Sequence, residues 1–190
     1  MARRSASPCI TRTDRSTPTR FFRLGQLRFC GRPLNTTSAR VACCADLLAA
    51  ELDAGSRVAI KGTAWTAYLP YAARWLIAVH LVPNRDVPDL VALDRDERDE
   101  LAEAYLDLLR RLDRYYEGPG GSPIALPYIA GWHQAPVRQG RDVSRLHLQV
   151  MSVLRAPGRL KYLAGSESGV GAWVNDVAPE RIAARLREVG

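Results

Sequence analysis

The sequence has few cysteines, few histidines and no long apolar run. Its four cysteines, Cys9, Cys30, Cys43 and Cys44, all precede residue 45, and none has C-x-x-C spacing. This pattern argues against a disulfide framework or a cysteine zinc knuckle and fits reduced thiols in a cytoplasmic protein. No apolar run approaches the roughly 20 residues that a membrane-spanning helix needs, so no membrane partner is expected. Walker A, G-x-S-x-G and paired-carboxylate signatures are absent as well.

Acidic residues are scarce at the start of the chain, and this scarcity accounts for the net charge of +7. Residues 1–40 contain nine arginines and one acidic residue, whereas the rest contains 18 basic and 19 acidic residues. A specific nucleic-acid-binding domain carries its basic stripe on folded elements, so no specific nucleic acid is expected as a partner. We interpret residues 1–43 as a disordered Arg-rich tail. A transit peptide, or docking of the tail on nucleic acid or an acidic surface, is the alternative.

Residues 44–190 have the pattern of one α+β domain with a mainly antiparallel sheet. Asp94 and Glu97 predict a capping box at the start of the longest helix, which repeats apolar residues at helical spacing. Two glycine-rich segments, 118–123 and 165–171, are expected to be loops. The predicted helices cover 46–55, 94–116 and a C-terminal stretch from Pro179, and the predicted strands cover 57–61, 65–69, 76–82, 127–134 and 145–154.

The three histidines are all expected on strands. His80 lies in an apolar strand with no visible partner and is interpreted as structural. His133 and His147 could face each other from two adjacent antiparallel strands, with Gln149 on the same side as His147. Two imidazoles and a glutamine make a weak metal site, because zinc and iron sites normally have three or four ligands.

The segment from Lys161 to Gly171 combines a lysine, serines and a glutamate with glycines. A lysine ammonium and free backbone N–H groups can hold a phosphate, and a carboxylate such as that of Glu167 can accept sugar hydroxyl protons. The alternative interpretation is an ordinary polar loop.

Several motifs in fixed order resemble the C-terminal half of galactose-1-phosphate uridylyltransferases, over about residues 44–188. They comprise Pro127-Tyr-x-x-Gly-Trp-His-x-Ala-Pro136, Leu146-His147, the stretch 155–167, Asn175-Asp176 and the stretch 179–186. Segments 48–52, 55–58, 65–70 and 73–75 match the same family in the same order, whereas residues 1–40 do not match.

The resemblance implies a half-barrel fold like that of the histidine-triad (HIT) proteins, and one half of a two-step enzyme. In the full enzyme, a His-Pro-His motif of the first half attacks UDP-glucose, and galactose-1-phosphate then takes the uridylyl group. The second half supplies hexose-phosphate contacts, which here correspond to Lys161 for the phosphate, Glu167 for the sugar hydroxyls, and Ala164 and Ser166. A further glutamine, found downstream in some members, has no clear match in this sequence, and Asn175 is a candidate stand-in for it. The pocket forms at a subunit interface, so the expected protein partner is a second copy or a separate N-terminal half.

The resemblance also implies zinc or iron for the full-length family. Its second-half metal site uses a glutamate and three histidines. His133 and His147 match two of the histidines, Gln149 occupies the third position and the glutamate has no counterpart, so the site is incomplete. No histidine of this sequence is followed by proline, so no catalytic residue is assigned.

The chain is therefore expected to be a truncated form that is inactive alone. The alternatives are a non-catalytic HIT-like module that binds sugar phosphate or nucleotide, and one part of a split enzyme.

Residues 1–40 should be dispensable for folding, because a strongly charged segment without periodicity cannot bury enough apolar surface to order itself. Thermal melts of the chain with and without this segment test the prediction. A large drop in the midpoint on deletion would show that the segment packs on the domain.

Overall fold

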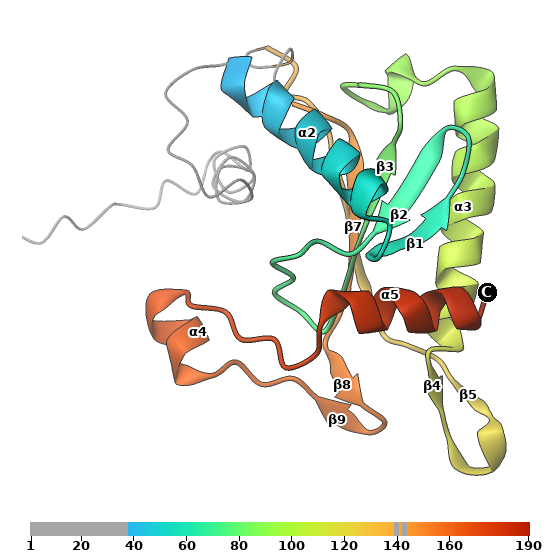
Figure 1. Ribbon diagram of the computed structural model, residues 1–190, viewed down its shortest axis with the longest axis vertical. Helices are drawn as coiled ribbons and strands as arrows, with labels where there is room; N and C mark the ends of the chain where they lie inside the picture. Colours follow the sequence, from blue (N-terminus) through green and yellow to red (C-terminus); the bar gives the residue numbers. More distant parts are fainter. Residues whose placement is uncertain (1–37, 139–140, 142–143) are drawn as a thin grey trace, which may run out of the picture. The chain divides into compact units, whose positions relative to one another are not determined.

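The computed structural model describes residues 38–138, 141 and 144–190, with side chains from residue 46 onward (Figure 1). Its centre is a five-stranded sheet in the order β1-β2-β3-β7-β6, with every neighbouring pair antiparallel. Strands β1 and β6 form the two edges and do not pair with each other, so the sheet is open. The strands are β1 (Val58–Lys61), β2 (Trp65–Tyr68), β3 (Ile77–Pro83), β6 (Ile129–His133) and β7 (His147–Ser152).

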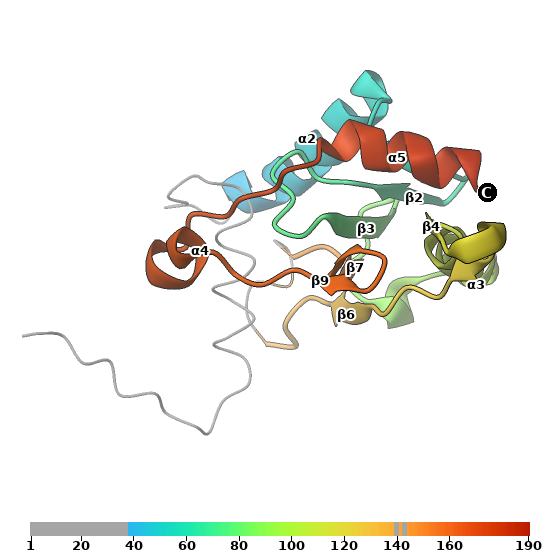
Figure 2. The same cartoon turned by 90° about the horizontal axis from the view of Figure 1, so that it is seen from below.

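Helices and two small hairpins surround the sheet. The helices are α2 (Ser38–Ala54), α3 (Arg95–Asp113), α4 (Gly165–Val170) and α5 (Pro179–Glu188), with 3-10 turns η1 (Leu90–Ala92) and η2 (Pro119–Gly121). The hairpins pair β4 (Tyr116–Glu117) with β5 (Pro123–Ile124), and β8 (Leu154–Ala156) with β9 (Arg159–Leu160). Seen from below, α4 and the chain that leads to α5 run clear of the strands (Figure 2).

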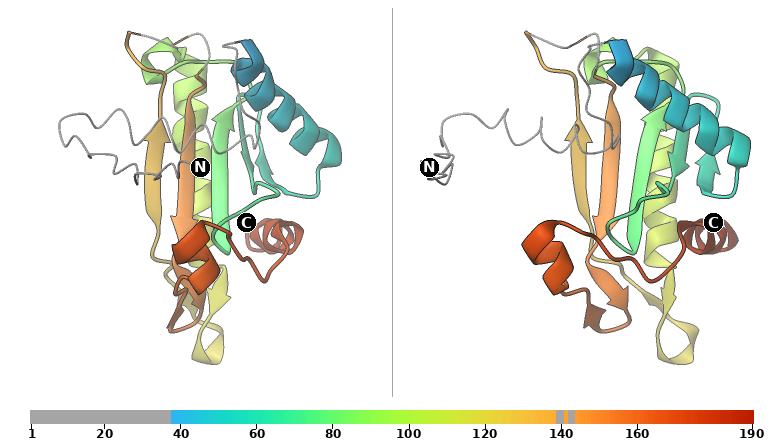
Figure 3. Two further views of the ribbon diagram at one scale, coloured as in Figure 1. Left: turned by 90° about the vertical axis from the view of Figure 1, so that its left-hand side faces the viewer. Right: turned by 60° about the vertical axis from the view of Figure 1, so that its left-hand side comes forward.

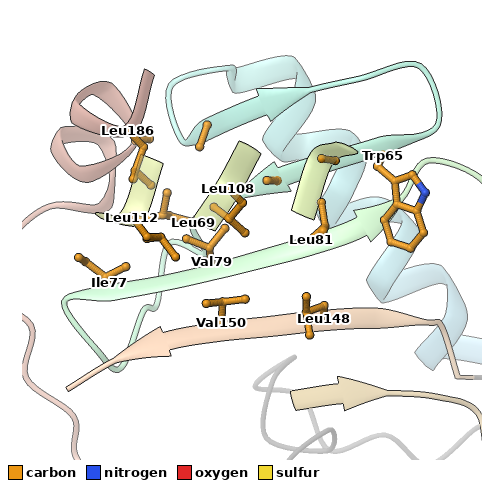
Figure 4. Close-up of a cluster of buried hydrophobic side chains, with 14 of the residues drawn as sticks. Trp65, Leu69, Ile77, Val79, Leu81, Leu108, Leu112, Leu148, Val150 and Leu186 are labelled. Atoms are coloured by element: carbon orange, nitrogen blue, oxygen red, sulfur yellow. The ribbon is translucent and has the colours of Figure 1, made fainter. Parts of the chain in front are cut away.

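Helix α3 covers one face of the sheet, and its sequence explains why it begins where it does. The Asp94 side chain accepts from the Glu97 amide at 2.8 Å, and the Glu97 carboxylate accepts from the Asp94 amide at 2.9 Å, which confirms the predicted capping box. Leu108 and Leu112 are fully covered, and the Trp65 indole of β2 donates to the Glu97 carbonyl at 2.7 Å. Figure 4 shows these side chains between the helix and the strands.

Helix α2 lies on the opposite side of the sheet from α3 (Figure 3). Leu48 of this helix is buried with Val58, Tyr68 and Val82 in a second, smaller apolar cluster. Alternation along β3 and β7 separates the two faces, because successive side chains of a strand point to opposite sides.

Helix α5 packs its buried residues Ile182, Ala183 and Leu186 into the same core as α3. Arg57, just before β1, ties α5 to α2 because its guanidinium bonds to Glu51 of α2 and Glu180 of α5, each at 2.7 Å. Along the described residues no helix is both long and apolar enough to cross a bilayer.

Three segments differ from the sequence-based expectation. The helix expected over 46–55 begins at Ser38, in a stretch free of proline and glycine. The predicted boundary between residues 43 and 44 therefore falls inside α2, and the predicted tail lies otherwise outside the described residues. The glycine-rich stretch 165–171 is not a loop but contains α4, which Gly171 ends in the left-handed conformation at φ 69°. The stretch 118–123 contains η2 and joins β4 to β5.

Truncating Leu108 should strongly destabilise the domain, because its side chain is 0% exposed at the centre of the core. Leu108→Ala is expected to lower the free energy of unfolding by about 2–5 kcal/mol. Leu106→Ala on the same helix is the matched control, since Leu106 is 52% exposed, and should change the free energy by no more than about 0.5 kcal/mol. Urea denaturation followed by circular dichroism measures both, and equal losses would contradict the assignment of this helix face to the core.

Candidate functional site

Lys161 and Glu167, the residues expected to contact hexose phosphate, lie against each other between β9 and α5. The Lys161 ammonium is 2.7 Å from a carboxylate oxygen of Glu167. The same ammonium donates to the carbonyls of Arg74 and Val174, each at 2.8 Å. Because an ammonium has three N–H donors, all the donors of Lys161 are used inside the chain.

The Glu167 carboxylate is equally well satisfied. Besides Lys161, it accepts hydrogen bonds from the amides of Ala164 at 2.7 Å and Val174 at 3.1 Å. The ion pair with Lys161, followed by these two amides, lowers the pKa of Glu167 to about 2. Glu167 is therefore an ionised carboxylate at every pH near neutrality, although the residue is only 5% exposed.

Two tryptophans flank the ion pair. The Lys161 ammonium lies 5.5 Å from the ring centroid of Trp75 and 5.7 Å from that of Trp173, within the range of cation–π attraction. The guanidinium of Arg74 lies 5.4 Å from the Trp173 ring. We call Lys161, Glu167, Trp75 and Trp173 the lysine clasp. It joins the β2–β3 connection to the segment around α4, which are far apart in the sequence.

The other residues expected at this site have different surroundings. Ala164 is exposed and contributes its amide to the Glu167 carboxylate, and the Ser166 side chain is exposed. Asn175, the candidate stand-in for a glutamine of the family, donates to the carbonyls of Ala73 at 3.3 Å and Trp75 at 3.1 Å. Its carboxamide therefore fixes the β2–β3 connection. Trp75 and Trp173 were not foreseen, because nothing in the sequence shows that two tryptophans nearly a hundred residues apart meet at one lysine.

The three histidines lie together on the sheet face opposite the main core. His133 of β6 and His147 of β7 are a direct cross-strand pair, and their rings stack with centroids 4.5 Å apart and planes 2° apart. This confirms the expectation that they face each other. His80 of β3 is buried, as predicted, and lies 6.0 Å from the His147 ring and 5.6 Å from the Tyr68 ring, contacts that the sequence did not reveal.

Gln149 of β7 completes this histidine cluster, which we define as His80, His133, His147 and Gln149. The His147 Nδ1 atom lies 3.0 Å from the Arg145 carbonyl, and its Nε2 atom lies 3.3 Å from the Gln149 side-chain nitrogen. Burial lowers the pKa of His147 to about 4 and that of His80 to about 3, and it also lowers the pKa of His133. All three imidazoles are therefore neutral at pH 7. Within the described part of the chain, no group of three or more His, Cys, Asp or Glu residues could hold a metal ion.

The lysine clasp and the histidine cluster are separate sites. His147 is the first residue of β7, whereas the Lys161 amide bonds to the carbonyl of Val153, just past the other end of that strand. With a rise of about 3.3 Å per residue, the two ends of β7 are too far apart for one small ligand group to contact both. The clasp can offer a cation, a carboxylate and two aromatic faces, and the cluster can offer neutral imidazoles and a carboxamide.

Comparisons with known proteins give the same family as the motifs. The family described as "Galactose-1-phosphate uridyl transferase, C-terminal domain" matches residues 36–190. The galactose-1-phosphate uridylyltransferase of Streptomyces lividans is 43% identical over 149 residues, which cover 72% of this chain and 39% of that protein. The protein of the same name from Rattus norvegicus is 31% identical over 142 residues, which cover 72% of this chain and 36% of that protein. The chain thus spans about two-fifths of the length of these relatives.

The structural comparison agrees with the sequence comparison. A solved uridylyltransferase is 31% identical and aligns with a TM-score of 0.67 over 77% of this chain and 44% of its own. An ADP-glucose phosphorylase from Arabidopsis thaliana, 20% identical, shares the fold with a TM-score of 0.56. The predicted α+β class with a mainly antiparallel sheet is confirmed. The family match covers most of the chain, and the chain therefore belongs to the galactose-1-phosphate uridylyltransferase family, in which it corresponds to the C-terminal domain.

Proposed function

We propose that this chain supplies the hexose-1-phosphate contacts of a uridylyltransferase that acts on UDP-glucose and galactose-1-phosphate. The observation that carries the proposal is the close pairing of Lys161 and Glu167, within a match to the family's C-terminal domain. A cation and a carboxylate held side by side suit a ligand that has a phosphate next to hydroxyl groups. In this proposal a histidine outside these 190 residues forms the uridylyl intermediate, and this chain alone has no turnover.

Ligand binding at the clasp must be an exchange of partners, because Lys161 has no N–H to spare. We infer that a phosphate oxygen replaces one of the two carbonyl acceptors of Lys161, those of Arg74 and Val174. Both carbonyl contacts lie at the exposed side of the clasp, whereas the Glu167 side chain is covered. Replacing a neutral acceptor by an anionic one favours the exchange, since hydrogen bonds between ionised groups are roughly twice as strong.

The surface around α4, next to the clasp, is suited to contact a protein partner, either a second copy or a separate N-terminal half. Apolar side chains around α4 are exposed to solvent, with Tyr162 85% and Val170 81% exposed. Leu163 and Val174 add to this apolar surface. Burying such a surface against a partner stabilises the assembly through the hydrophobic effect.

Galactose-1-phosphate should bind the full chain weakly and through the clasp. Lys161→Ala should weaken the binding of galactose-1-phosphate and of inorganic phosphate alike, by about 10- to 100-fold, as expected for a lost charge-assisted hydrogen bond. Glu167→Gln should lower the preference for galactose-1-phosphate over inorganic phosphate, because the amide accepts sugar hydroxyl protons less well. NMR titration of both ligands measures these effects.

Lys61→Ala is the matched control, because Lys61 is the other lysine of the chain and is exposed at the end of β1. It should bind both ligands as the wild type does. Wild-type affinity in Lys161→Ala would refute the assignment of the clasp to the ligand.

The clasp should also make folding stability depend on acid. The folded pKa of Glu167, about 2, lies below its ordinary value of 4.5. The unfolded chain therefore takes up the proton first, and the stabilisation is complete above about pH 5 and is lost as the pH falls towards 2. The melting temperature of the wild type should exceed that of Glu167→Gln at pH 7, and the two should converge near pH 2. Glu103→Gln, an exposed change on α3, is the control, and its melting temperature should stay close to that of the wild type at both pH values. A difference in melting temperature between wild type and Glu167→Gln that persists at pH 2 would contradict the ion-pair account.

A further inference from the structure

The histidine cluster does not have the geometry of the metal centre that the family resemblance implies. A zinc ligand histidine points the lone pair of one ring nitrogen at the ion, about 2.0–2.1 Å away in the plane of the ring. The rings of His133 and His147 are stacked with planes only 2° apart, so their planes do not converge on a common point between them. A single ion cannot lie in both ring planes while the rings stay stacked.

The ring nitrogen of His147 that would bind a metal is also already engaged. A carbonyl oxygen can only accept, so the 3.0 Å contact with the Arg145 carbonyl fixes the proton of His147 on Nδ1. Nε2 is then the acceptor, and it receives the side-chain N–H of Gln149 at 3.3 Å. Gln149 also interacts with the His133 ring, whose pKa it raises against the effect of burial, so one carboxamide acts on both imidazoles. A carboxamide nitrogen donates hydrogen bonds and is no metal ligand.

We propose that Gln149 replaces a metal ion in this domain and converts the site into a metal-free hydrogen-bonded stack that holds strand β6 to β7. Strand β6 is an edge of the sheet and pairs only with β7 among the described residues. A cross-strand pair of stacked rings, bridged by a carboxamide from the next position on the same face of β7, cross-links these strands at the end where both histidines lie. The proposal concerns only the chain's own residues and does not depend on its function.

The metal content of the full chain tests this proposal. Wild type, His147→Phe and Gln149→His are each equilibrated with micromolar Zn²⁺, or with Fe²⁺ without oxygen, then desalted and analysed by mass spectrometry for metal per chain. His147→Phe keeps the aromatic stack but removes the nitrogens, so the comparison with wild type cancels any metal held elsewhere. Wild type should hold no more metal than His147→Phe, and EDTA should leave its melting temperature unchanged.

Gln149→His removes the bridging N–H donor and adds a third imidazole, which meets the ligand number of zinc sites. It should hold about one more zinc ion per chain than His147→Phe, and added zinc should raise its melting temperature. Melting curves show whether each variant is folded, and His133→Phe replaces His147→Phe if the latter is not. A wild type that holds one metal ion more than the phenylalanine variant overturns the proposal, and so does a folded Gln149→His that gains none.

Discussion

The alternation of side chains along β3 and β7 is the constraint on which the rest of this domain depends. These two strands form the centre of the sheet, and alternate apolar residues along them point to the face that α3 and α5 cover: Ile77, Val79, Leu81, Leu148 and Val150. The residues between them then have to point the other way, which places His80, His147 and Gln149 on one surface. A shift of the register by one residue would exchange the two faces, and the core and the histidine cluster would both be lost.

The longest helix and the strands of the central sheet could be predicted from the sequence, whereas elements that depend on contacts between distant residues could not. Helix α3 was predictable because its capping box and its apolar spacing are patterns of residues close together in the sequence. The sheet strands were predictable for the same reason, since alternation and β-branched residues are also patterns of neighbouring residues. Helix α4 was missed because its glycines lower intrinsic helix propensity, whereas the amide of Ala164 and the carboxylate of Glu167 stabilise its first turn.

For the site, the resemblance identified Lys161 and Glu167 but not what surrounds them. Their partners, Arg74, Trp75 and the Val174 carbonyl, come from segments whose approach is decided by the packing of the whole domain. The same holds for the stacking of His133 on His147. Two strands could be expected to bring these rings together, but the ring planes follow from which hydrogen bonds the neighbours offer. The donors and acceptors around a side chain depend on the tertiary structure, and no residue spacing in a single sequence reveals them.

The two sites show opposite uses of the same principle, that buried polar groups must be satisfied. In the histidine cluster both ring nitrogens of His147 are satisfied by neutral groups, one carboxamide and one carbonyl. In the lysine clasp the satisfaction is complete but charged, and two of the three acceptors of Lys161 are neutral carbonyls on its exposed side. A neutral acceptor of an ammonium can be exchanged for an anion with a gain in electrostatic energy, whereas a neutral acceptor of a neutral imidazole cannot. The lysine clasp, beside the Val153 end of β7, can therefore exchange a neutral acceptor for an anion, whereas the end of β7 that carries His147 is suited to hold the sheet together.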